Sequence, residues 1–307
     1  MNFVFSENNL RRLCQINSFE FPDDGLVFFG LRGCTVVNET QSVQFADSHQ
    51  LDTVDLNYKR PRCVIGQWKP AEGKIACFIG STVPSISYIQ HALAAQGVGA
   101  NQLMTGRYDD YVKGIHKYGR PTGHRAFRQT KARAIRRTMD DLDYENNDRV
   151  EVMNPFDNIH AGWCSGFDAG YDSAGCQVLM GHPKCAARGA ADETGHWKIF
   201  RRNAYSLEQN QFVYILLTGN DAMRQSLAGE AKRSARLRYG SEGELVKTMQ
   251  QALQDREILE SNPDGNFGQR TLMALLSFQE QTFGTNADDG VAGPMTAEAL
   301  GIEWPEV

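Results

Sequence analysis

The sequence has no apolar run long enough to cross a membrane. Its longest candidates, residues 26–31 and 212–217, are much shorter than the roughly 20 apolar residues that a spanning helix needs. Both runs are instead typical of buried strands. Residues 1–8 lack a basic stretch followed by an apolar run, so we expect no Sec-type signal peptide. Action in the cell wall or periplasm would then require delivery by lysis, a phage particle or a contractile injection apparatus.

The chain also lacks an excess of positive charge. Its formal net charge is −5, so no global basic field would attract nucleic acid or an anionic membrane, and we expect neither partner. The hydrophobic fraction of 41% and the charged fraction of 22% are ordinary for a globular protein. No Cys-x2-Cys pair is present among the seven cysteines, and their odd number leaves at least one thiol unpaired within the chain.

Two kinds of pattern divide the chain. Residues 1 to about 130 contain short apolar runs broken by Gly, Pro, Asn and Asp, which favour strands and turns, with a helix expected at 85–95. We expect the first domain to span residues 1–225. Residues 226–242 are rich in charge and predict a linker. Residues 243–307 carry helical apolar spacing and predict a small three-helix domain. The predicted class is α+β, with a β-rich first domain.

The last segment contains an internal repeat. Residues 264–271 read DGNFGQRT and residues 289–296 read DGVAGPMT, with Asp, Gly, Gly and Thr at matching offsets. Each copy predicts a tight glycine-bearing turn that leads into a helix, and Pro294 fits the first turn of the second helix.

This segment resembles the peptidoglycan-binding domain found at the ends of many cell-wall enzymes. The resemblance rests on both Asp-Gly turns and on Phe278-Gln279 between them. It implies peptidoglycan as the partner, and it implies a binding role for the turn residues Asp264, Gly265, Phe267, Gly268, Thr271, Asp289 and Gly290.

Residues 158–178 contain the highest concentration of candidate catalytic side chains in the chain. A cysteine nucleophile needs a base, a group that fixes the tautomer of the base, and N–H donors for an oxyanion. Cys176 could be that nucleophile and His160 its base. The small residues before Cys176 allow a sharp turn that directs the amides of Gly175 and Cys176 at a developing negative charge.

His160 followed by the sequence SAGC at 173–176 resembles the catalytic motif of the L,D-transpeptidases, the YkuD-like family. The sequence RPTGHRAF at 120–127 is similar to a strand start of that family. The resemblance implies a YkuD-like core with Cys176 as nucleophile, His160 as base and a backbone carbonyl just after His160 as orienter. It also implies an oxyanion hole at the Gly175–Cys176 turn, braced by Ser173.

Two positions depart from that family. Ala174 stands where the family usually has a second histidine, and Val178 stands where an arginine commonly follows the cysteine. The first change removes a supporting imidazole and the second removes a carboxylate contact.

The implied reaction needs no cofactor. Cys176 would attack the amide after the L-centre of diaminopimelate in a stem peptide and form a thioester. Transfer to an amine would give a 3-3 cross-link, and transfer to water would give carboxypeptidase or hydrolase activity. Trp163, Gly162 and Gln177 are the predicted substrate contacts. His124 lies in the strand predicted at 120–127, and we expect no catalytic role for it.

Two other interpretations remain open. Thiolate and imidazole ligands suit zinc, and a zinc site could be built from His160, Cys164, Cys176, His182 and Cys185. Alternatively, the first domain could be degenerate, and the protein would then be a non-catalytic wall-binding protein.

Overall fold

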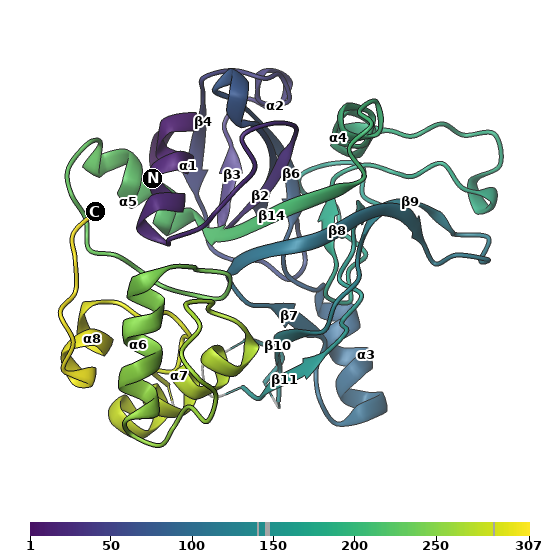
Figure 1. Cartoon of the computed structure of the whole chain (residues 1–307). Coiled ribbons are helices and arrows are strands. Elements are labelled where there is room, and N and C mark those ends of the chain that lie inside the picture. Colours follow the sequence, from purple (N-terminus) through teal and green to yellow (C-terminus); the bar gives the residue numbers. More distant parts are fainter. Residues whose placement is uncertain (140, 145–147, 285) are drawn as a thin grey trace.

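The computed structural model describes residues 1–139, 141–144, 148–284 and 286–307. It has a β-rich body and a group of helices at the C-terminal end, as the α+β prediction requires. Figure 1 shows the C-terminal helices beneath the body, beside the small sheet that contains β7, β10 and β11. No helix in the described ranges combines the length and the apolar character needed to span a membrane.

A closed barrel forms the centre of the body, in the order β12-β13-β6-β5-β2-β14-β8-β9. Strands β12 and β13 are parallel, as are β14 and β2, and the other neighbours are antiparallel. The strands are β2 (Val27–Arg32), β5 (Cys63–Lys69), β6 (Lys74–Ser81), β8 (Gly106–His116), β9 (His124–Gln129), β12 (Ile159–Ala161), β13 (Gln177–Leu179) and β14 (Gln211–Thr218).

The two apolar runs predicted as buried strands are β2 and β14, and this prediction is confirmed. They lie side by side in the barrel, with Tyr214 opposite Phe28. Phe28 stacks on Phe212 with the ring centroids 4.4 Å apart, whereas Phe29 packs towards Phe5 on the other face of β2. Both faces of β2 are therefore buried, which is why its sequence is continuously apolar rather than alternating.

Two small sheets and several helices surround the barrel. One sheet contains β1 (Asn2–Ser6), β4 (Ser48–Thr53) and β3 (Cys34–Val36), and the other contains β11 (Val150–Met153), β10 (Arg133–Arg137) and β7 (Asn101–Leu103). The helices of the body are α1 (Glu7–Ile16), α2 (Glu39–Ser42), α3 (Ile86–Gln96), α4 (Gly195–Tyr205) and α5 (Gly219–Ala228), with 3-10 turns at Pro70–Glu72 and Ala186–Arg188. The helix expected at 85–95 is α3.

The C-terminal segment forms α6 (Glu244–Gln254), α7 (Gln269–Phe283) and α8 (Pro294–Leu300), which confirms the predicted helical domain. Its core includes Val246, Met249 and Leu275, all fully buried. The same cluster contains Met104 and Ala134 of the body. The helical domain therefore packs directly on the body.

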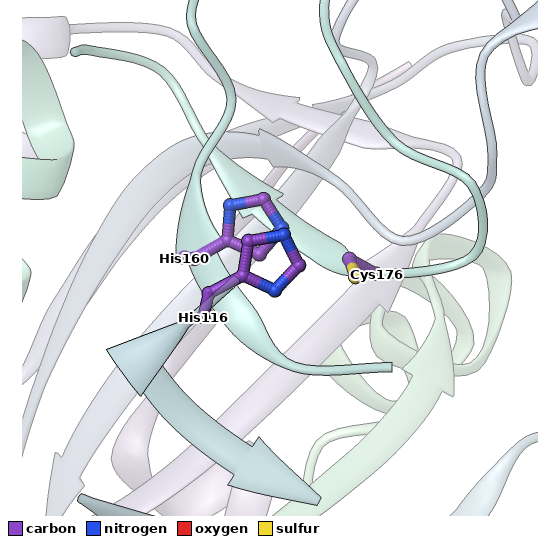
Figure 2. A group of neighbouring side chains, drawn as sticks. All are labelled: His116, His160 and Cys176. Carbon is purple, nitrogen blue, oxygen red and sulfur yellow. The ribbon is translucent and has the colours of Figure 1, made fainter. Parts of the chain in front are cut away.

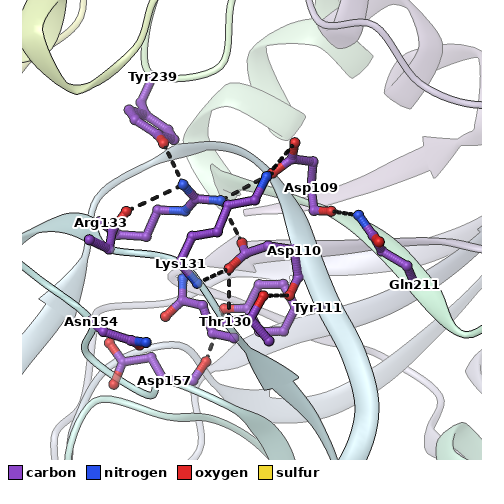
Figure 3. A network of polar contacts seen from close by, with 12 residues as sticks. Asp109, Asp110, Tyr111, Thr130, Lys131, Arg133, Asn154, Asp157, Gln211 and Tyr239 are labelled. Atoms are coloured by element: carbon purple, nitrogen blue, oxygen red, sulfur yellow. Dashed lines mark hydrogen bonds and ion pairs between the residues drawn. The ribbon is translucent and has the colours of Figure 1, made fainter.

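The segment predicted as a linker contacts both parts of the molecule. Helix α5 crosses the predicted boundary at 225, and the residues between α5 and α6 form turns and isolated bridges rather than a helix or strand. Tyr239 pairs with Gly106 of the barrel, and Leu237 pairs with Ala292 of the helical domain. Arg133 donates to the Tyr239 hydroxyl at 3.0 Å and to buried Asp110 at 2.6 Å (Figure 3). The exact limits of the domains stay a prediction.

Candidate active site

The parallel pairing of β12 and β13 brings His160 and Cys176 together. His160 lies in the middle of β12, opposite Val178, and Cys176 immediately precedes β13. A ring nitrogen of His160 and the Cys176 Sγ lie within 4.8 Å of each other (Figure 2). The fold thus places the two predicted reacting groups at one point.

The hydrogen bonds of His160 define its tautomer. Its Nδ1 lies 2.8 Å from the carbonyl oxygen of Ala161, which can only accept, so Nδ1 carries the proton. This carbonyl is the one predicted as orienter. The Nε2 atom is then unprotonated and able to accept a proton. Burial and the neighbouring His116 and His124 hold the pKa of His160 well below its usual value, so the ring is neutral.

His124 supports this arrangement from β9. Its Nδ1 lies 2.7 Å from the carbonyl oxygen of Thr122, so that nitrogen also carries the proton. Its Nε2 is left as an acceptor, 3.3 Å from the His160 Nδ1. His124 thereby helps to keep the His160 proton on Nδ1.

A third imidazole, His116, is not predicted by the sequence pattern. It is the last residue of β8, and its ring stacks on His160 with the centroids 4.0 Å apart and an angle of 16° between planes (Figure 2). Asn158 lies 2.9 Å from its Nδ1. Burial and His124 lower the pKa of His116 to about 3, so this ring is neutral too. No sequence motif contains His116. Its place near the site follows only from the pairing of β8 with β9, in which His116 lies opposite His124.

The Cys176 thiol is protected in the free protein. It is 8% exposed, and its Sγ lies 3.6 Å from the carbonyl oxygen of Phe156. Burial and the nearby Asp157 raise the pKa of the thiol well above its usual value. The resting pair is therefore a neutral thiol beside a neutral imidazole, and thiolate forms only when a proton moves to His160.

The turn before Cys176 requires glycine. Gly175 has φ +136°, and a Cβ there would lie 2.5 Å from both Asn101 Nδ2 and Asp157 Oδ1. Ser173 Oγ donates to the carbonyl of Cys176 at 2.7 Å and accepts from the N–H of Gly175 at 3.2 Å. The Gly175 amide, predicted as an oxyanion donor, is thus occupied by Ser173.

The three predicted substrate contacts have different surroundings. Trp163 is half-buried, with its ring 5.9 Å from His124, and its φ of +57° is strained for a tryptophan. Gly162 is buried, and its N–H donates to the carbonyl of Leu179 in the neighbouring strand β13. Gln177 is fully buried and donates to the carbonyl of Gly175 at 3.1 Å. Trp163 faces the site, whereas Gly162 and Gln177 support it from within the protein.

The predicted zinc ligands are only partly brought together. Among the described residues, one group of His and Cys side chains has metal-binding spacing, and it consists of His116, His160 and Cys176. Cys164, His182 and Cys185 are not in this group. All seven cysteines are unpaired and buried.

The two Asp-Gly turns of the C-terminal domain are built around buried glutamines. The Gln250 side chain accepts from the N–H groups of Asp264 and Gly265 and donates to Asp264, Thr271 and the carbonyl of Asn266. In the second turn, Gln279 accepts from the N–H of Gly290 and donates to Asp289. The sequence repeat is therefore a repeat of hydrogen bonding.

The predicted wall-binding residues occupy both the interior and the surface. Phe267 and Thr271 are buried, and Gly265 and Gly290 supply the positive φ that the turns need. Asp264, Gly268 and Thr271 line a cavity of about 520 Å³. Asp289 lines a second, larger cavity of about 710 Å³.

Comparison with known proteins identifies only the C-terminal part. No curated protein and no solved structure matches the chain, so a YkuD-like fold of the body is not confirmed. Residues 242–300 match the family Putative peptidoglycan binding domain. The C-terminal part of the chain therefore matches a peptidoglycan-binding domain, and this match supports peptidoglycan as a partner and targeting to the cell wall.

Proposed function

We propose that the protein is a peptidoglycan-modifying cysteine enzyme that acts on stem peptides. One observation carries this proposal: the Cys176 thiol lies beside a neutral His160 whose Nδ1 proton is held by the Ala161 carbonyl. This arrangement leaves the His160 Nε2 free to accept the thiol proton. The wall-binding domain on the same chain supplies the substrate class.

The first step is acylation of Cys176. His160 Nε2 takes the thiol proton as Sγ attacks the carbonyl carbon of the amide after the L-centre of the stem peptide. The oxyanion is met by the Cys176 N–H, because the Gly175 N–H is held by Ser173. The C–N bond then breaks, the terminal D-residue leaves with the proton from His160, and a thioester remains.

The second step depends on the acceptor. An amine or a water molecule gives a proton to His160 and attacks the thioester carbon, and the released Sγ takes the proton back. An amine acceptor yields a 3-3 cross-link, and water yields carboxypeptidase or hydrolase activity. The protein would reach the wall by lysis, a phage particle or an injection apparatus.

The C-terminal domain raises the local concentration of substrate. It binds the polymer and packs directly on the catalytic body through Met104 and Ala134. Tethering of this kind converts capture of a stem peptide into an intramolecular event.

Intact-mass analysis after incubation with a stem tetrapeptide tests this function. The wild-type chain should gain the mass of an acyl group, and Cys176→Ala should not. Cys185→Ala is the matched control, because Cys185 is equally buried but lies outside the cluster, and it should retain the adduct. Absence of the adduct from every variant contradicts the enzyme and leaves a wall-binding protein.

A zinc site is the second candidate, and the grouping of His116, His160 and Cys176 favours it. Catalytic zinc sites use three protein ligands and keep one position open for water. About one zinc per purified chain, lost in both Cys176→Ala and His116→Phe, would support this alternative over the thioester.

A further inference from the structure

A basic cavity lies at the junction of the body and the C-terminal domain. Its volume is about 330 Å³, and residues from both parts line it. The charged side chains around it are five arginines and two aspartates: Arg32, Arg136, Arg224, Arg236, Arg238, Asp221 and Asp289. This concentration of arginine contrasts with the acidic net charge of the chain.

Some of these charges are balanced within the protein. Arg238 forms an ion pair with Asp221 at 3.3 Å. Arg136 donates to the carbonyl oxygens of Asp148 and Asp288, and the carboxylates of the same residues lie near its guanidinium.

Three arginines keep an excess of positive charge at the cavity. Arg32 donates only to uncharged oxygens, those of Thr82 and Leu103. Within the described ranges, neither Arg224 nor Arg236 forms an ion pair. The buried Nε of Arg236 has no hydrogen-bond partner there either. A buried cationic N–H without an acceptor is costly, so an oxyanion bound in the cavity would stabilise Arg236.

We infer that this cavity binds an oxyanion of the wall polymer, a carboxylate or a phosphate group. The planar guanidinium group matches both oxyanions with two parallel hydrogen bonds. Arg224 is exposed on α5 and Arg236 is half-buried, so both are able to turn towards a bound group. The two aspartates do not close the site, because Asp221 is paired with Arg238 and Asp289 accepts from Gln279 and from the Val291 N–H.

The cavity neighbours both sites described above. Asp289 and Val291, which line it, belong to the second Asp-Gly turn of the wall-binding domain. The cavity of about 710 Å³ beside that turn shares Arg236, Asp289 and Val291 with it. One polymer segment could therefore occupy both cavities.

On its other side, the cavity approaches the catalytic turn. Gln102 of β7 lines the cavity, and the preceding Asn101 donates to Asp157 at 2.6 Å, directly against Gly175. An anion held here would anchor the polymer between its binding domain and Cys176.

Calorimetric titration of the full chain tests the site without requiring catalysis. The probes are a soluble disaccharide-tetrapeptide fragment of peptidoglycan, which carries carboxylates, and inorganic phosphate. Arg224→Gln/Arg236→Gln should bind the preferred probe about tenfold or more weakly than the wild-type chain. Arg202→Gln, an exposed arginine on α4, is the control and should bind as the wild type does.

The outcomes separate the two sources of oxyanion. Arginine-dependent binding of the fragment alone assigns a stem-peptide carboxylate, and arginine-dependent binding of phosphate assigns a phosphate-bearing polymer. Equal affinity of wild type and double variant, or no binding of either probe, overturns the proposal. The double variant should fold normally, since neither side chain makes a hydrogen bond within the described residues, and an unchanged thermal transition would verify this. Cys176 acylation could persist in either case, so failure here is distinct from failure of the proposed enzyme.

Discussion

His116 stacks on His160 with the ring centroids 4.0 Å apart, so two neutral imidazoles lie beside Cys176. His116 comes from β8, whereas the L,D-transpeptidase motif that this turn resembles has its second histidine at the position of Ala174. The Ala174 side chain is exposed here and contributes no donor or acceptor. We expect His116 to provide the missing imidazole from β8, which is separated from β12 by β9 in the barrel.

His116→Phe should slow acylation of Cys176 by roughly tenfold to a hundredfold, because it keeps the ring stacking but removes both nitrogens. His116 also lowers the pKa of His160. Its loss should therefore move the acidic limb of the pH–rate profile to higher pH. The measurement is the rate of adduct formation by mass spectrometry between pH 5 and 9.

His91→Phe is the matched control, since His91 is exposed on α3 and should leave the rate and the pH profile unchanged. A His116→Phe enzyme with wild-type rate and profile would show that His116 serves packing alone.

Gly175→Ala should destabilise the protein by about 2 kcal/mol or more. The residue has φ +136°, and its Cβ would approach Asn101 and Asp157 to 2.5 Å. Gly166→Ala tests the same change at a site with nothing within 4 Å, and it should cost less than about 0.5 kcal/mol. Urea unfolding of both variants measures the difference. Equal stabilities would show that the turn before Cys176 does not require glycine at position 175.

Gln250→Ala should destabilise the C-terminal domain by about 2–4 kcal/mol, because several buried partners in the first Asp-Gly turn lose their hydrogen bonds. The neighbouring Gln251 is exposed, and Gln251→Ala should cost less than about 0.5 kcal/mol. Thermal unfolding, followed by pull-down on purified sacculi, measures both stability and wall binding. Retention of full stability by Gln250→Ala would contradict the structural role of the repeat.

Stability should fall as the pH is lowered from about 6.5 towards 4. The pKa of His116 is lowered to about 3 and that of His196 to about 4, in both cases mainly by burial. The unfolded chain, with ordinary histidines, therefore binds protons before the folded chain does. The loss is at most about 1.4 kcal/mol per pH unit for each such histidine.

Urea unfolding at pH 7.5, 6 and 5 measures this slope. His116→Phe should reduce the slope because one buried neutral histidine is removed. A free energy of unfolding that stays constant over this range would count against the neutral histidine cluster.

Contiguous patterns were enough to predict several features of this protein. The apolar runs at β2 and β14 and the DG-containing repeat depend on residues that are close in sequence, so the buried strands and the wall-binding domain could be recognised directly. The pair His160 and Cys176 was also proposed from a local motif, and adjacent parallel strands bring it together. Its catalytic role stays a prediction.

The remaining features depend on closure of the barrel and on docking of the helical domain. His116 reaches His160 only because β8 and β9 pair at the end of the barrel, and Gln177 is buried because β13 lies between β12 and β6 in the closed barrel. The arginine cavity combines side chains of β2, β10, α5 and the segment before α6 with the second Asp-Gly turn. The sequence alone was enough to predict the α+β fold class and the peptidoglycan-binding domain. Tertiary structure decided which imidazoles, amides and arginines share a site, because these contacts join segments that no local pattern connects.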